Sequence, residues 1–140
     1  MEPWERFEPA VAWQQRLNQM PSEWYRGQTL SRMMLSSLQN LIAQEARGMA
    51  RLRCTATSLA VERYRKAHDG QYPDSLAALV PDFMASVPLD PFDGKPLRYL
   101  KQPVGYRIYS LGPDRDDDQG RGPGNVRPNE DYDISVTIER

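Results

Sequence analysis

The 140-residue sequence contains a single cysteine and a single histidine, and this scarcity excludes whole classes of site. One cysteine cannot form an internal disulfide. One cysteine and one histidine are too few for a zinc site built from those ligands. The cysteine, Cys54, falls within a helical apolar pattern, which favours a small buried hydrophobic side chain over a reactive thiol.

The sequence also lacks a strong charge of either sign and a long apolar run. Lys and Arg number 18, Asp and Glu number 19, and the net charge is −1. The scattered basic residues argue against a nucleic-acid partner. No stretch approaches the roughly 20 apolar residues of a membrane-spanning helix, and the opening "EPWERFEP" does not resemble a secretion signal. We therefore expect no membrane span and no targeting signal in this chain.

Three segments follow one another along the chain. Residues 1–28 combine prolines with aromatic residues, and this segment packs either on the chain's own long helix or on a partner. Residues 29–69 have the three-and-four apolar spacing of a long amphipathic helix, with Thr29 as N-cap and Gly70 beyond its end. Residues 70–140 form a small α+β domain. Such a helix is longer than the domain can cover, so we expect its N-terminal half to contact a protein partner or another copy of the chain.

The apolar positions of the helix predict one helical stripe. The positions assigned to it are Leu30, Met34, Leu38, Leu41, Ile42, Met49, Leu52, Ala56, Leu59, Ala60, Tyr64 and Ala67. Gly48 interrupts the helix with a residue that costs about 1 kcal/mol relative to Ala, and it predicts a bend or a close contact.

The domain is expected to begin with a short helix and to continue as antiparallel strands. The short helix opens at Asp74 or Ser75. The segments "PLRYLK" and "YRIYSL" form a hairpin that turns near Gly105. The segment "DISVTIE" alternates apolar and polar residues, as a half-buried strand does. The predicted architecture is α+β, with a long N-terminal helix packed on a small antiparallel sheet.

An acidic loop, residues 112–133, joins the last two strands and contains seven carboxylates and four glycines. Carboxylate oxygens on a glycine-bearing loop are suitable ligands for calcium, although a solvated charge run has the same composition. The spacing of Asp114, Asp116 and Asp118 imitates the start of an EF-hand. Gln119 and Asn125 then stand where that motif needs Gly and Glu, so an EF-hand is rejected.

Six sequence features in order resemble the soluble domain of the type II secretion major pseudopilin, the G subunit. They are the long helix, Tyr72-Pro73 before a short helix, the segment "DPFDG", Pro96 with Tyr99, the segment "YSLGPD", and Asp133-Ile134. The resemblance covers roughly residues 55–140. It implies a pseudopilin-like fold, a calcium ion in the acidic loop, and an extracytoplasmic location in the periplasm or cell envelope.

The resemblance also implies a set of metal ligands. Asp114 matches the family's aspartate after "SLG", the backbone carbonyl of Leu111 is a candidate, and Asp131 and Asp133 match a late acidic pair. Asp116 and Asp118 join the set from the spacing of the acidic run. The candidate ligands are thus Leu111, Asp114, Asp116, Asp118, Asp131 and Asp133, with Ca²⁺ as the cofactor. Removal of calcium is expected to loosen the loop and the final strand.

The sequence favours a non-catalytic structural or assembly module, and the resemblance suggests a type II secretion-like system. Outside the acidic loop, the clearest paired carboxylates are Asp90 and Asp93, and their proline-rich setting is typical of a turn. The chain departs from the pseudopilin family in having no apolar anchor helix. It is therefore either a shortened form or a reuse of the fold. The alternative is a C-terminal binding or structural domain of a larger cell-envelope protein, unrelated to secretion.

Overall fold

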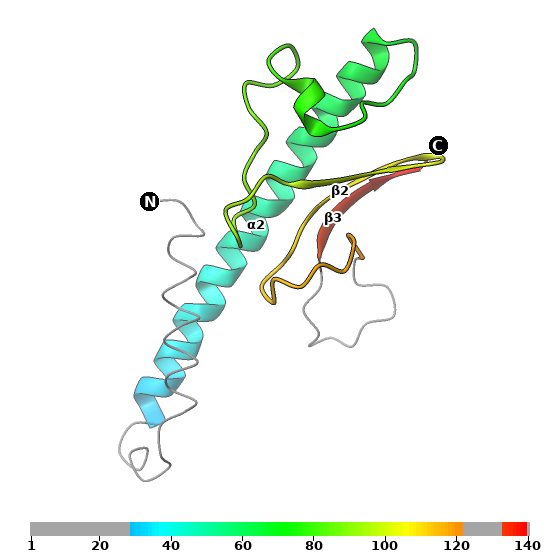
Figure 1. Ribbon diagram of the computed structural model, residues 1–140. Helices are drawn as coiled ribbons and strands as arrows, with labels where there is room; N and C mark the ends of the chain where they lie inside the picture. Colours follow the sequence, from blue (N-terminus) through cyan, green and yellow to red (C-terminus); the bar gives the residue numbers. More distant parts are fainter. Residues whose placement is uncertain (1–28, 122–132, 140) are drawn as a thin grey trace.

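The computed structural model describes residues 29–121 and 133–139, and for residues 29–40 it describes the backbone alone. A long helix, α2 (Thr29–Ala67), lies across a small sheet, and the N-terminal part of the helix extends beyond that sheet (Figure 1). The α+β architecture predicted from the sequence is confirmed. The aromatic segment 1–28 lies outside the described residues.

Helix α2 ends where the sequence predicts an end. Its 39 residues correspond to a length of about 58 Å. The amide of Gly70 donates to the carbonyl of Arg65 over 2.9 Å, and both Asp69 and Gly70 have positive φ angles, 50° and 87°. This left-handed reversal satisfies a carbonyl of the last turn and turns the chain back toward the sheet. The short helix that follows is a 3₁₀ turn, η2 (Leu76–Leu79).

Three antiparallel strands form the sheet in the order β1-β2-β3, and these are β1 (Arg98–Gln102), β2 (Gly105–Ser110) and β3 (Ile134–Ile138). The register places Arg98 opposite Tyr109 and Tyr109 opposite Ser135. Gly105 opens β2 with a φ of 113°, and a Cβ there would lie 1.8 Å from the carbonyl oxygen of Ile138. Only glycine fits that position, so the predicted hairpin turn is sterically fixed.

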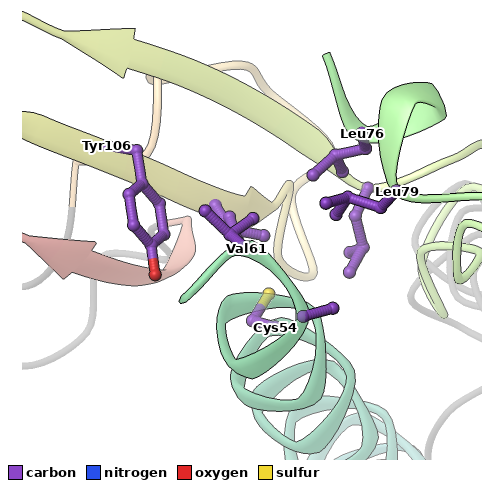
Figure 2. Packing of buried hydrophobic residues seen from close by; sticks show 8 residues of the cluster. Cys54, Val61, Leu76, Leu79 and Tyr106 are labelled. Carbon is purple, nitrogen blue, oxygen red and sulfur yellow. The ribbon is translucent and has the colours of Figure 1, made fainter. Parts of the chain in front are cut away.

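The main core lies between α2, η2 and the inner face of the sheet. Figure 2 shows Cys54 and Val61 of the helix, Leu76 and Leu79 of η2, and Tyr106 of β2 around one apolar interior. The hydroxyl of Tyr106 donates to the carbonyl of Ser58 over 3.1 Å. Cys54 is fully buried, and burial raises the pKa of its thiol to about 12, as expected for a packing residue.

The prediction of one apolar stripe on the helix is confirmed for Ile42, Ala60 and Tyr64, which pack in the core, and wrong for three of its leucines. Small residues face the sheet, among them Ala46, Ala50 and Cys54, all almost completely buried. Three leucines assigned to the stripe, Leu41, Leu52 and Leu59, are instead 64%, 69% and 63% exposed. Small side chains let the helix backbone approach the sheet closely, so the sheet covers the small-residue face and leaves the leucines outside.

Candidate metal site at the acidic turn

The acidic turn, residues 112–121, follows β2 and folds back over the sheet. Arg115, Gln119 and Gly120 have positive φ angles of 62°, 59° and 73°. A Cβ on Gly120 would lie 2.3 Å from Cδ of Arg107 and 3.0 Å from Cδ1 of Tyr109. Since these two side chains alternate with Tyr106 and Ile108 of the core, the turn covers the face of β2 opposite the helix.

Asp133, immediately before β3, is the one predicted metal ligand among the described residues whose carboxylate is deeply buried. The residue is only 1% exposed. Its Oδ2 accepts a hydrogen bond from the amide of Gly120 over 2.8 Å. Its Oδ1 is buried as well and has no hydrogen-bond donor among the described residues. A buried carboxylate oxygen without a partner is costly, so Asp133 is only half satisfied by this part of the chain.

The electrostatic surroundings of Asp133 oppose its negative charge. Burial raises the pKa of this carboxyl, and the charges of Asp117 and Asp118 raise it further, while the amides of Gly120 and Asp118 lower it. The resulting pKa is about 6, compared with an ordinary value of 3.8. At neutral pH the turn therefore holds a buried anion beside two further anions, which is an environment that a cation would stabilise.

Asp117 is the residue of this turn that the sequence interpretation missed. Its Oδ1 accepts the hydroxyl of Tyr109 over 3.0 Å and the amide of Gln119 over 2.9 Å. Burial raises the pKa of Tyr109 to about 12, and the hydrogen bond with Asp117 adds to the shift. The alternating ligands of an EF-hand suggested Asp116 and Asp118. The left-handed residues Arg115 and Gln119 break that alternation and bring Asp117 to the sheet.

Of the other predicted ligands that the structure describes, Asp118 acts on the Asp133 carboxyl through its charge and its amide, whereas Leu111 and Asp114 have different partners. Leu111 is buried, and its amide donates to Oδ2 of Asp90 over 2.9 Å. Asp114, Asp116 and Asp118 are exposed. Oδ1 of Asp114 accepts the amide of Asp116 over 3.3 Å, which is a turn contact. Asp131 lies outside the described residues.

The described part of the turn does not present a closed metal centre. Across residues 29–121 and 133–139, no three His, Cys, Asp or Glu side chains are grouped so that they could hold a metal ion. Asp117 and Asp118 influence the pKa of Asp133 through their charges, which act at longer range than metal coordination. The geometry therefore supplies one buried carboxylate with a vacant acceptor and two neighbouring anions.

A second buried carboxylate, Asp90, serves a different purpose in the "DPFDG" turn. Its Oδ1 accepts the amide of Phe92 over 2.9 Å and the hydroxyl of Ser110 over 2.8 Å. Its Oδ2 accepts the amide of Leu111 over 2.9 Å and Nη1 of Arg98 over 2.6 Å. The predicted turn role is confirmed, and the carboxylate also fastens this turn to the end of β2.

Arg98 links Asp90 to its neighbour Asp93. The Arg98 guanidinium also pairs with Asp93, whose Oδ1 accepts the amide of Lys95 over 3.0 Å. Burial raises the pKa of Asp93, but the hydrogen bonds and charges of Arg98 and Lys95 lower it more, so the pKa lies below its ordinary value. Both carboxylates of this turn thus have cationic and amide partners.

Comparison with protein-family models, curated proteins and solved structures finds no match for this chain. Within the part of the chain that the structure describes, no helix is both long and apolar enough to cross a membrane.

Proposed function

We propose that this chain is a non-catalytic structural and assembly module, similar to the soluble domain of the type II secretion major pseudopilin, with an acidic turn that is ordered by calcium. The arrangement of a long helix across a three-stranded antiparallel sheet supports the proposal at the level of fold. The helix extends beyond the sheet, which leaves part of its length for contacts with other molecules (Figure 1).

The observation that carries the proposal is the half-satisfied carboxylate of Asp133. A side chain that is 1% exposed, with one oxygen lacking a donor and a pKa near 6, is poorly stabilised by its described neighbours. Calcium would supply positive charge and accept oxygen ligands in flexible geometry. Asp133 would hold the ion, with Asp117 and Asp118 as the neighbouring carboxylates. Leu111, Asp114 and Asp131 remain the further ligands proposed from the resemblance, and Asp116 remains the one proposed from the spacing of the acidic run.

Two candidate chemical groups are already committed to packing, which supports a non-catalytic role. The Cys54 thiol has a pKa of about 12 and stays protonated at neutral pH. The Asp90 carboxylate accepts four hydrogen bonds, so its lone pairs are engaged within the fold. A turn site of modest affinity would fill at the millimolar calcium found outside the cytoplasm, so the proposal includes an extracytoplasmic location.

Calorimetric titration of calcium into chelator-treated full-length protein tests the proposal. We expect binding at one site in the wild type, and at least a tenfold loss of affinity in Asp133→Asn, which keeps the shape of the side chain but removes its charge. Asp82→Asn is the matched control, because it removes the same charge from an exposed residue of another loop. Absence of binding in the wild type, or equal binding in Asp133→Asn, would contradict the calcium site.

A further inference from the structure

The outer face of α2 carries an unusual combination of residues, Leu41, Gly48, Leu52 and Leu59, which we call the leucine face. At 3.6 residues per turn, these four positions lie within about 20° of the direction of Leu41. The buried Ala50 lies on the opposite side of the helix. Each of the three leucines is more than 60% exposed, so the leucine face is an apolar strip without a covering partner among the described residues.

Gly48 gives the leucine face a shape that a row of exposed leucines alone would not have. In the interior of a helix, glycine costs about 1 kcal/mol relative to alanine. A Cβ built on Gly48 meets no atom within 4 Å, so nothing in the described fold requires glycine there. The missing side chain leaves a hollow in the strip, four residues before the protruding Leu52.

The spacing of hollow and protrusion is self-complementary, and we propose that the leucine face binds a second copy of this chain in an antiparallel helix pair. With the twofold axis at the level of residue 50, Leu52 of each copy lies over Gly48 of the other. Leu41 then faces Leu59 across the same seam. Each contact occurs twice, as an isologous dimer requires. The inference names the partner of the assembly role proposed above, and it rests on that role.

Charge and volume favour the antiparallel pairing over the parallel one. In a parallel pair in register, Glu45 would face Glu45 of the other copy, and two glycines at position 48 would leave a void. In the antiparallel pair, Glu45 faces Thr55, and the leucine at position 52 fills the hollow. The seam from residue 41 to residue 59 is about 27 Å long. An interface of this size belongs to the weak, reversible class, so the dimer should form at high micromolar concentration.

Analytical ultracentrifugation of the full chain between 10 and 500 µM tests the inference. We expect a reversible monomer–dimer equilibrium, weakened at least tenfold by Leu52→Glu. Val104→Glu is the matched control, since Val104 is an exposed apolar residue between β1 and β2 and not part of the leucine face, and this variant should change the equilibrium less than twofold. Gly48→Leu should also weaken dimerisation tenfold without destabilising the monomer, because the monomer has open space at this position and leucine favours a helix more than glycine does.

Disulfide formation tests the orientation in a Cys54→Ala background. A mixture of Leu41→Cys and Leu59→Cys proteins should form crosslinked heterodimers, since the antiparallel pair brings these positions together. Efficient crosslinking of Leu52→Cys alone would instead indicate a parallel pair and overturn the proposal.

A chain that is monomeric at every concentration would also overturn the inference. If Leu52→Glu then changed the tryptophan emission, the covering partner would be the chain's own N-terminal segment, because all three tryptophans lie within residues 1–28. A monomer that still binds calcium would leave the calcium-ordered turn standing and remove only the dimer. A dimer that binds no calcium would support the antiparallel pair and remove only the calcium-ordered turn.

Discussion

Asp90 and Asp133 are both buried carboxylates next to a strand, yet the fold treats them differently. Asp90 is 0% exposed and accepts four hydrogen bonds, one of them from a guanidinium. Asp133 is 1% exposed and accepts an amide at one oxygen, while the other oxygen has no donor among the described residues. Burial alone therefore does not define a structural carboxylate, because the partners decide whether the charge stabilises the fold.

The hydrogen-bond network around Asp90 is complete, whereas the network around Asp133 is incomplete among the described residues. The partners of Asp90 come from its own turn, from β1 and from the end of β2, so its charge helps to fix three segments together. The neighbours of Asp133 include two further anions, Asp117 and Asp118, and the combined effect of burial and charge raises its pKa to about 6. The first carboxylate is expected to stabilise the fold as it stands, and the second to stabilise it only when a cation is bound.

Replacing Asp90 should cause the largest loss of stability. Asp90→Ala removes one of the two carboxylates that pair with Arg98 and leaves Ser110 and two amides without their acceptor. We expect a decrease of about 3–5 kcal/mol in the free energy of unfolding, measured by urea denaturation. A loss below about 1 kcal/mol would mean that the network contributes little, and the contrast between the two aspartates would fail.

When calcium is absent, replacing Asp133 should increase the free energy of unfolding, whereas replacing Asp90 should decrease it. Because the folded-state pKa is raised, the wild type is most stable below the unfolded-state pKa and loses stability as pH rises from about 4 to 6. Asp133→Asn has no carboxyl to ionise, so the variant does not lose stability over this pH range. At pH 7 in chelator, the variant should be about 1–2 kcal/mol more stable than the wild type, measured by urea denaturation. A less stable variant under these conditions would show that the buried charge is already compensated.

Removing the hydroxyl of Tyr109 should have the smallest effect of the three. Tyr109→Phe deletes the hydrogen bond to Asp117 and preserves the packing of the ring against the turn. We expect a loss of about 0.5–1.5 kcal/mol, measured by thermal and urea denaturation. Tyr99→Phe is a useful control, since its hydroxyl bonds the Pro73 carbonyl far from the turn and its loss should leave calcium binding unchanged.

Much of the fold follows from local sequence signals. The helix end at Asp69 and Gly70, the turn at Gly105 and the alternation of Ile134, Val136 and Ile138 each identify an element within a few residues. The buried face of the helix did not follow from hydrophobicity. A count of apolar residues selects leucines, whereas close contact with the sheet selects Ala46, Ala50 and Cys54 for their size.

The candidate site was only partly predictable from the sequence. Asp133 was predicted as a ligand from the resemblance, but its burial depends on Gly120, thirteen residues earlier, which has room for the turn only because it lacks a side chain. Asp90 was assigned to a turn from its neighbours. Its hydrogen bonds with Ser110 and Leu111 join positions 20 and 21 residues apart, so no local sequence pattern predicts them.

The most direct test of the proposed calcium-ordered turn is the difference in unfolding free energy between the wild type and Asp133→Asn from pH 4 to pH 8, measured in chelator and in 10 mM calcium. In chelator, the variant should be favoured above pH 6, and the difference should vanish toward pH 4. In 10 mM calcium at pH 7, the wild type should gain about 1.4–2.7 kcal/mol if its dissociation constant is roughly 0.1–1 mM. The variant's advantage should shrink by that amount, and at the tighter end the wild type should become the more stable protein. The same difference in both solutions would contradict the account.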